Sequence, residues 1–380
     1  MEISNIMDLV NSAAKESMGS EAIKVKDTST LVSTGEKVLS SEKYLSRFYS
    51  ALVDRIGKTV TSIKTYNGAD LGIRKDTLEW GIITQKLNFK MPEAGENPIW
   101  SSSKRKSPYD INTTLKVESA YYASANGFSF DSVILDKQLK QSFTGPAEMG
   151  AFVNGIYTAI KNAYTLSVEN SERLALATGI AVSLNAGGMC AINLLSEYNT
   201  SRGVTLTTDE ALRNPDFLKY CSLRINTITN LMGSLSTAFN PKGWQKFTTK
   251  DEVVVNMLDL FVKNMETYLT SDVYHKDLIR LPNYKPVQYW QAVKGTSMSY
   301  DFNTLSTINI KNKIEEVELQ KEQSGIVAYV HAPESVSTCV YDTDTASHYN
   351  QFDRRTAYQL AGTVGYICDL FENGVVFYIA

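Results

Sequence analysis

The stretch PAEMGAFVNGIYTAIKNAYTLSVENSERLALATGIAVSLNAGG, residues 146–188, decides the fold of this chain. Its leading proline suits the first turn of a helix, and Glu148 follows where the helix dipole favours negative charge. Apolar residues recur at helical spacing from Phe152 to Leu184, and Gly187-Gly188 predicts the end of the helix. Such a helix spans roughly 55–60 Å at 1.5 Å per residue. That length exceeds the usual globular helix, so we expect it to serve as a scaffold axis.

Two further helices and a short strand are expected beyond the long helix. Asn214 should cap a helix that continues from the following proline to about Phe239, and a break at 240–243 should end it. The valine run after Glu252 favours a strand over residues 252–257, although a capping pattern also precedes it. A helix over residues 260–269 should follow that strand.

The last hundred residues are rich in strand-forming residues. Glu372-Asn373-Gly374 predicts a tight turn before the last strand. Gly362 and Gly365 fall inside a strand pattern, where glycine indicates a bulge or a close backbone approach. The expected strands are Ile326–His331, Ser337–Tyr341, Tyr358–Cys368 and Val375–Ile379.

The chain changes character twice before the long helix. Residues 1–42 are rich in Ser, Thr, Lys and Glu, and we expect an extended or partly ordered arm that gains its order mainly from a partner surface. Residues 44–56 have the spacing of a short amphipathic helix. Residues 78–84 and 114–125 are β-like, which indicates a long two-stranded excursion from the body.

The tip of this excursion holds the candidate functional residues. A two-stranded excursion has almost no core of its own, so we expect it to rest on a neighbouring subunit. Trp100 is best suited to anchor such a contact, although local packing explains it as well. For Lys104, Arg105 and Lys106, a solvated loop tip and a contact with a neighbour are equally supported. Contact with DNA ranks third, because three adjacent charges bind phosphate weakly in salt.

Composition argues against several classes of protein. The 380 residues carry a formal net charge of -3, whereas a dedicated nucleic-acid-binding protein usually has a basic face. The 4 cysteines form no CxxC pair, so we expect neither a zinc site nor a redox pair, and reduced thiols in a cytoplasm-like compartment. We find no secretory signal and no apolar run of membrane-spanning length.

A search for catalytic motifs leads us to expect no catalytic, metal-binding or cofactor-binding residues. The sequence holds no phosphate loop, dinucleotide fingerprint or nucleophile elbow. His275, His331 and His348 form no metal-binding pair, and we expect each at a surface or interface. Asp342-Thr343-Asp344, with Asp353, could offer oxygen ligands to a hard cation, but a solvated turn is the favoured interpretation.

The order of these elements resembles the Hong Kong 97-like fold of tailed-bacteriophage major capsid proteins. That order is polar arm, short helix, β excursion, long helix, mixed segment and closing strands. Several stretches are also similar to the head proteins of small Bacillus podophages, and their shared order is more specific than any one of them. These stretches are ALVDRIG at 51–57, NGF at 126–128, LKQSF at 139–143, the helical segment 152–160 and the closing segment 326–379.

The resemblance implies an α+β fold with an N-terminal arm, an E-loop hairpin, a long spine helix, and P and A domains. The implied boundaries are 1–44 for the N-terminal arm, 45–65 for the entry helix and strand of the P domain, 66–125 for the E-loop, 126–243 for the spine helix and P domain, 244–339 for the A domain, and 340–380 for the closing strands of the P domain.

The resemblance also implies a function. Copies of the chain would self-assemble in the bacterial host cytoplasm into pentamers and hexamers, and these would form the icosahedral or prolate head shell of the virion. The shell would enclose double-stranded DNA without sequence-specific binding, with portal and scaffolding proteins as further partners and no membrane. The podophage proteins continue into an immunoglobulin-like domain, and we expect that module to be missing after Ala380. The resemblance gives no catalytic acid for a Lys–Asn cross-link, so none is expected.

Three alternatives remain open. An encapsulin-like compartment shares the fold and would bind a cargo peptide. An enzyme with dispersed catalytic residues would need a compact pocket near His275 or His331. A surface-layer protein would be expected to carry a secretory signal.

Overall fold

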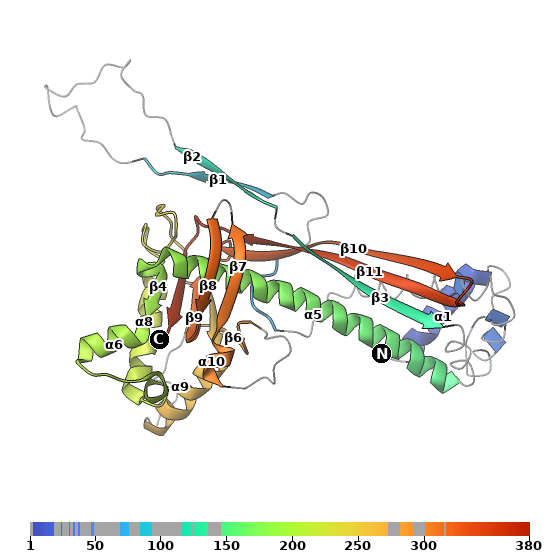
Figure 1. The fold of residues 1–380 in the computed structure, drawn as a ribbon, viewed down its shortest axis with the longest axis horizontal. Helices are drawn as coiled ribbons and strands as arrows, with labels where there is room; N and C mark the ends of the chain where they lie inside the picture. The colour runs from blue at the N-terminus through green and yellow to red at the C-terminus, as the bar shows by residue number, and fades with distance from the viewer. Residues whose placement is uncertain are drawn as a thin grey trace, which may run out of the picture.

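The computed structural model describes residues 3–18, 24, 30, 33–34, 37–38, 47–48, 69–75, 84–92, 116–123, 125–135, 146–272, 282–291, 301–314 and 317–380. Figure 1 shows two larger sheets arranged along one long helix, α5, and a two-stranded hairpin, β1–β2, that projects away from them. The α+β class expected from the sequence is confirmed.

The axis of the molecule is α5, which spans Pro146–Ala186 and confirms the long helix predicted from the sequence. Its 41 residues extend about 60 Å. Gly187 and Gly188 have φ angles of 66° and 56°, which side chains with a Cβ disfavour, and the helix ends there. Ala175, Ile180 and Ala181 are buried in the core, so the C-terminal half of the helix is held by packing.

A five-stranded sheet forms the core beside α5. The middle strand, β9, is buried at every position, which a strand covered on both faces requires. It pairs antiparallel with β12 and β5, and β4 and β6 join the outer sides in parallel. The strand order is β4 (Ala191–Asn193), β12 (Gly374–Tyr378), β9 (Ile326–His331), β5 (Val254–Leu258) and β6 (Lys285–Val287).

Helix α8 (Pro215–Leu231) starts where the sequence predicted but ends earlier. The Asn214 side chain accepts hydrogen bonds from two backbone N–H groups of the first turn, at 3.0 and 3.2 Å, which confirms the cap. The expected end near Phe239 is wrong. The chain leaves the helix at Met232, whose carbonyl accepts a hydrogen bond from Thr248 N at 2.8 Å, a long-range contact that local propensity cannot reveal.

Neighbouring helices surround the core sheet. The strand and helix expected over 252–257 and 260–269 are confirmed as β5 and α9, with shifted bounds. The flanking helices are η5 (Gly188–Cys190), α6 (Leu194–Arg202), α7 (Thr208–Ala211), α9 (Asp259–Asp272) and α10 (Phe302–Leu305), and a separate hairpin consists of β7 (Ile308–Ile314) and β8 (Val317–Gln323).

A long three-stranded sheet lies along α5. Its order is β10 (Val336–Asn350), β11 (Arg355–Cys368) and β3 (Ala125–Leu135), all antiparallel. The solvated turn expected at Asp342-Thr343-Asp344 is wrong, because these residues pair with β11 inside β10. Their polar side chains favour a turn locally, but the ladder to β11 continues and overrides that preference. The ladder between β10 and β11 has a register shift between Val340 and Asp342, as at a β-bulge.

The two glycines of β11 confirm the close approach expected from the sequence. A Cβ on Gly365 would lie 2.0 Å from the ring of Tyr341, and one on Gly362 would lie 2.7 Å from the ring of Phe128. Phe128 also packs edge-on against Tyr164 of α5, with ring centroids 6.0 Å apart. The absent side chains therefore make room for the aromatic rings of neighbouring strands.

Substituting Gly365 by Ala should destabilise the fold by about 1–3 kcal/mol, because the Tyr341 ring must move out of its place. Gly127 in β3 is a matched control, since a Cβ at this position would meet nothing within 4 Å, and Gly127→Ala should be neutral within about 0.5 kcal/mol. Urea unfolding of both variants measures the difference. Equal stability of the two variants would contradict the role given to Gly365.

The N-terminal segment expected to be an extended or partly ordered arm over residues 1–42 contains α1 (Ile3–Met18), so it is ordered rather than extended over these residues. Val10, Ala13, Ala14 and Met18 are buried, which is a helical spacing, and α1 packs against α5. Two of these four residues are alanines, which bury little apolar area, so the burial of the stripe was hard to infer from composition. The helix expected over 44–56 is described only at 47–48, where both residues are helical.

Candidate functional site

The projecting hairpin consists of β1 (Thr84–Phe89) and β2 (Val117–Tyr122), paired antiparallel with Lys86 opposite Ala120. The expected two-stranded excursion is therefore confirmed, although residues 78–83 of its first predicted strand lie outside the described residues. Side chains alternate between the two faces of such a ladder. One face is turned to the body of the subunit and is partly buried, and the other is exposed.

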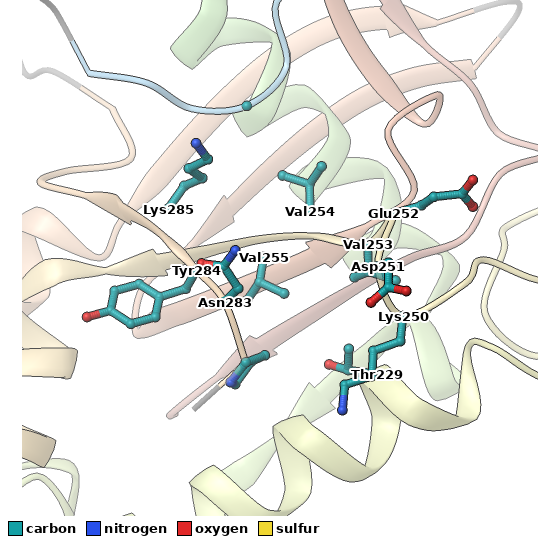
Figure 2. A pocket seen from close by; sticks show the side chains of 12 residues that line it. Thr229, Lys250, Asp251, Glu252, Val253, Val254, Val255, Asn283, Tyr284 and Lys285 are labelled. Carbon is teal, nitrogen blue, oxygen red and sulfur yellow. The ribbon is translucent and has the colours of Figure 1, made fainter. Parts of the chain in front are cut away.

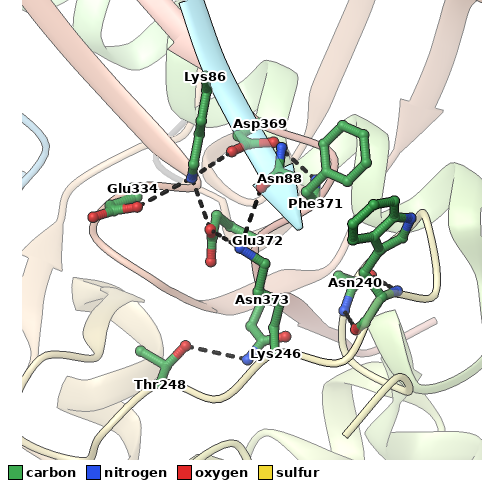
Figure 3. Close-up of polar contacts among 11 residues, drawn as sticks. Lys86, Asn88, Asn240, Lys246, Thr248, Glu334, Asp369, Phe371, Glu372 and Asn373 are labelled. Carbon is green, nitrogen blue, oxygen red and sulfur yellow. Dashed lines mark hydrogen bonds and ion pairs between the residues drawn. The ribbon is translucent and has the colours of Figure 1, made fainter. Parts of the chain in front are cut away.

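The inner face is held on the body by charged groups, shown in Figure 3. We call this cluster the seat; it consists of Lys86, Asn88, Lys246, Glu334, Asp369 and Glu372. Lys86 Nζ lies 2.7 Å from carboxylate oxygens of both Asp369 and Glu372, and 3.0 Å from one of Glu334. The Asp369 side chain is fully buried, so the lysine compensates a charge that water cannot reach.

A second lysine completes the seat from the segment that follows α8. Lys246 Nζ donates to Glu372 Oε1 at 2.8 Å and to Asn88 Oδ1 at 3.2 Å. Asn88 is itself buried on the hairpin, so this bond satisfies a polar atom that water does not reach. The seat thus joins four segments that are far apart in the sequence, which are residues 86–88, 246, 334 and 369–372.

The pKa values in the seat reflect this pairing. Burial alone would lower the pKa of Lys86, but the carboxylates of Asp369 and Glu372 outweigh it and raise the pKa above the ordinary lysine value. Burial alone would raise the pKa of Glu372, but hydrogen bonds from Lys246 and Lys86 lower it. Both groups are therefore fully charged at neutral pH.

A small apolar cluster supports the seat. Ala120 and Tyr122 of the hairpin are buried against Phe371, and Trp244 packs edge-on to Phe371 with ring centroids 5.2 Å apart. The expectation that the excursion needs a neighbour to rest on is thus wrong for its base, which lies on its own subunit. It stays a prediction for the opposite face.

The outward face of the hairpin is an exposed apolar stripe. We define it by Leu87, Phe89, Val117 and Tyr121, whose side chains are 50–62% exposed. Phe89 lies directly opposite Val117 in the ladder, and Leu87 is two residues from Phe89 on the same face. Gln85 and Ser119 share this face, yet soluble monomeric proteins rarely leave four large apolar side chains clustered in water, so the outward face is the best candidate for a contact surface.

The residues predicted from the sequence to form contacts cannot be compared with this surface. Trp100, Lys104, Arg105 and Lys106 lie outside the described residues, and their role stays a prediction. The seat was missed altogether. The alternation of Lys86 and Asn88 with Leu87 and Phe89 could have indicated a strand with one polar and one apolar face, but the partners of the polar face come from distant segments.

One histidine is not where the sequence suggested. His331 is fully buried in β9, and the expectation of a surface or interface position is wrong for it. Its ring stacks on Tyr329 with centroids 4.8 Å apart, and Nε2 lies 3.1 Å from Asn256 Oδ1. Burial lowers the pKa of His331 to about 4. His348 is exposed in β10, and His275 lies outside the described residues.

His331 should make stability depend on pH. The folded-state pKa of about 4 lies below the ordinary value of 6.5, so the unfolded chain binds this proton more readily. The neutral, buried His331 contributes about 3 kcal/mol to the free energy of unfolding. This contribution is complete above pH 6.5 and is lost as the pH falls toward 4. Urea unfolding at several pH values should show a shallower dependence for His331→Gln than for the exposed control His348→Gln. Identical pH profiles for the two variants would refute the assignment.

Figure 2 shows a cavity of about 370 Å³ between β5, β6 and α8. Lys250 and Lys285 lie on opposite sides of it, with Asp251 and Glu252 near Lys250. Lys285 is paired with Asp70. The mixed charges select no ligand class, and we assign none.

The described part of the chain offers few signs of other site types. No group of three or more His, Cys, Asp or Glu residues among those described is arranged to hold a metal ion. Within the same residues, no helix combines the length and hydropathy that a membrane crossing requires.

The sequence matches one protein-family model over nearly its whole length. The model for Phi29-like phage major capsid proteins matches residues 8–378, nearly the whole chain. The chain belongs to this family. The major capsid protein of Streptococcus phage Cp-1 is 24% identical over 143 residues. That alignment spans 38% of the present chain and 38% of the relative, so the match covers well under half of the relative's length.

Solved structures place this capsid protein among Hong Kong 97-like folds. A chain in the bacteriophage P68 structure of head fiber and inner core protein has a TM-score of 0.55 at 9% identity, and covers 81% of this chain and 83% of its own. A chain in the capsid structure of Staphylococcus phage Andhra has a TM-score of 0.52 at 8% identity, with coverage of 81% and 83%. These likenesses concern the fold, and they agree with the resemblance drawn from the order of elements.

Proposed function

We propose that this chain is the shell subunit of a bacteriophage head, which assembles with copies of itself into pentamers and hexamers around double-stranded DNA. In this proposal the hairpin is the E-loop, α5 is the spine helix, and the domain boundaries are those expected from the sequence. Portal and scaffolding proteins are the further partners, and assembly takes place in the host cytoplasm.

The observation that carries the proposal is the two-faced hairpin. Its inner face is fastened to its own subunit by the seat, while its outward face exposes four large apolar side chains. A hairpin that is already fixed on its own subunit, with one face exposed, is suited to pack on another copy, because the hairpin loses little conformational entropy on contact. Contacts of modest strength suffice in a closed shell, since each copy makes many at once.

A second exposed feature supports contact between copies. Phe352 is 97% exposed on the turn between β10 and β11. The turn is ordered by its own polar groups: Asn350 Oδ1 accepts a hydrogen bond from Phe352 N at 3.0 Å, and Asp353 pairs with Arg355 at 2.9 Å. An aromatic side chain held out by a rigid turn is typical of a contact anchor.

The alternatives receive less support. The net charge of -3 fits a shell that encloses DNA without tight binding. An encapsulin-like compartment would share the fold, but the family match is to phage capsid proteins. For an enzyme, His331 is fully buried in β9 and lines neither the cavity beside β5 and β6 nor the one beside residues 69–74.

Electron microscopy of the purified protein, with and without a scaffolding protein, tests the proposal. We expect uniform closed particles in at least one condition. A protein that stays monomeric in both conditions, by sedimentation and by microscopy, would overturn the proposed function.

A further inference from the structure

Both ring nitrogens of the buried His331 face oxygen atoms. Nδ1 lies 2.8 Å from Ala332 O, and Nε2 lies 3.1 Å from Asn256 Oδ1. The other end of the Asn256 amide, Nδ2, donates to Leu71 O at 2.9 Å. These contacts form one chain that runs from β9 through β5 to residue 71. His331 and Asn256 are both 0% exposed, so each contact must find its hydrogen among these groups.

The chain of contacts is one hydrogen short while the ring is neutral. Its two ends, Ala332 O and Leu71 O, are carbonyl oxygens that only accept hydrogen bonds. A neutral imidazole supplies one N–H, and the Asn256 amide supplies another from its NH2 end, whichever way round the amide lies. Three contacts therefore share two hydrogens. An imidazolium ring supplies two N–H groups, so only the charged ring completes all three contacts.

The contact at stake is the one to Leu71. The ring contact with Ala332 is the shorter of the two, at 2.8 Å, so the single hydrogen of a neutral ring belongs on Nδ1. Nε2 is then a bare acceptor, and the Asn256 amide can donate either to Nε2 or to Leu71 O. A neutral His331 thus competes with Leu71 for the same donor.

Leu71 belongs to a segment that we call the strap, residues 69–75. The strap exchanges two backbone hydrogen bonds with Thr338 of β10, each at 2.9 Å, and its Asp70 pairs with Lys285 of β6. The strap precedes β1 in the sequence. The bond from Asn256 therefore fastens the chain to the core sheet shortly before the hairpin begins.

We propose that His331, Asn256 and Leu71 form a proton-operated clasp between the core sheet and the strap. A proton taken up by the ring places an N–H group on both nitrogens, which frees the Asn256 amide to donate to Leu71 O. Loss of that proton lets the bare nitrogen compete for the amide and opens the clasp part of the time. Because the closed strap favours the charged ring, the charged ring favours the closed strap by the same factor. The strap therefore tightens as the pH falls from 6.5 toward 4, although the whole fold loses stability over the same range.

The groups around the ring leave its titration to burial and hydrogen bonding. Val254 of β5 and Gly374 of β12, which lie opposite His331 in the ladders, do not titrate. Tyr329 stacks on the ring, and burial raises the pKa of its hydroxyl above the ordinary value, so it stays neutral. Carboxylates on the strap, on α5 and on the loop before β12 are paired with cations; the pairs are Asp70–Lys285, Glu172–Arg74, Asp369–Lys86, and Glu372 with Lys86 and Lys246.

Hydrogen exchange of the full-length protein at pH 6.5 and pH 4 tests the clasp. The protection of the strap peptide is corrected for the intrinsic effect of pH on exchange and divided by the protection of α6 as a reference. This ratio should rise about twofold or more at pH 4 in the unmodified protein and in His348→Gln, the exposed control. It should stay constant in His331→Gln and in Asn256→Leu. A ratio that does not rise in the unmodified protein, or that still rises in Asn256→Leu, would overturn the inference.

A milder variant keeps the test decisive where those core substitutions unfold the protein. Lys285→Met removes the ion pair with Asp70 and so loosens the strap from the surface. By charge alone, the loss of a cation would raise the pKa of His331, whereas loosening the strap should reduce the proton affinity of the ring about twofold or more.

Nitrogen NMR of histidine-labelled protein measures this titration. The chain has 3 histidines, so His275→Gln and His348→Gln identify the signals of His331 by elimination. A raised or unchanged pKa of His331 in Lys285→Met would overturn the inference. Both measurements report on the subunit itself, so either result leaves the proposed function intact.

Discussion

Leu87→Asp combined with Phe89→Asp is expected to abolish particle formation and leave a folded, soluble subunit. Both side chains lie on the outward face, and more than half of each is exposed to solvent in the single subunit. The fold therefore gains little from them, and a change at such positions usually alters stability by no more than about 0.5 kcal/mol. Burying an unpaired carboxylate in an interface costs several kcal/mol at each contact, and the cost is repeated around the shell.

Three measurements check this expectation. Electron microscopy and sedimentation report particles, and urea unfolding reports the stability of the subunit. Leu166→Asp is the matched control, because this leucine on α5 is as exposed as Leu87 and should assemble when substituted. Particles of normal size and yield from the double variant would show that the outward face is not a contact surface.

Lys86→Met is expected to loosen the hairpin and to destabilise the subunit by about 3 kcal/mol. The Asp369 side chain is fully buried and Lys86 is the lysine paired with it, so the variant leaves a buried carboxylate without its cation. Lys246 still forms an ion pair with Glu372 at 2.8 Å. The loss of stability is therefore smaller than if all the ion pairs of the seat were removed. Lys86→Arg keeps the charge and should retain most of the stability.

Hydrogen exchange separates a local effect from a global one. Amides of β1 and β2 should exchange faster in Lys86→Met. The exchange rate of the β9 amides should change only as much as the free energy of global unfolding predicts. Unchanged exchange in the hairpin, together with unchanged urea unfolding, would show that the seat does not hold it. Assembly of the Met variant should need a higher protein concentration, because the hairpin is no longer fixed before contact.

The sequence predicted those parts of the fold that depend on local signals. α5 carries its own start and stop, Asn214 is a cap residue, and β9 is an almost continuous apolar run, so α5, β9 and the start of α8 were found close to their true positions. The end of α8 and the strand over 342–344 depend instead on pairing with segments far along the chain. Propensity describes a residue and its near neighbours, so it cannot predict these pairings.

The candidate site was predicted only in outline. A two-faced excursion was expected, but its holding contacts join residues 86–88 to residues 246 and 369–372. Charged residues are common on surfaces, and nothing local distinguishes Lys86 from a solvated lysine. The apolar residues of the outward face were visible as β-formers, yet only the ladder register shows that four of them share one side.

The position of β12 has a consequence for the order of events during synthesis. This strand lies between β4 and β9, so residues 374–378 fill the interior of a sheet whose other strands are made earlier. The sheet can close only after they have emerged from the ribosome, and until then β9 lacks a partner on one side. A nascent chain that has not yet exposed residues 374–378 therefore cannot present a finished core sheet to its neighbours.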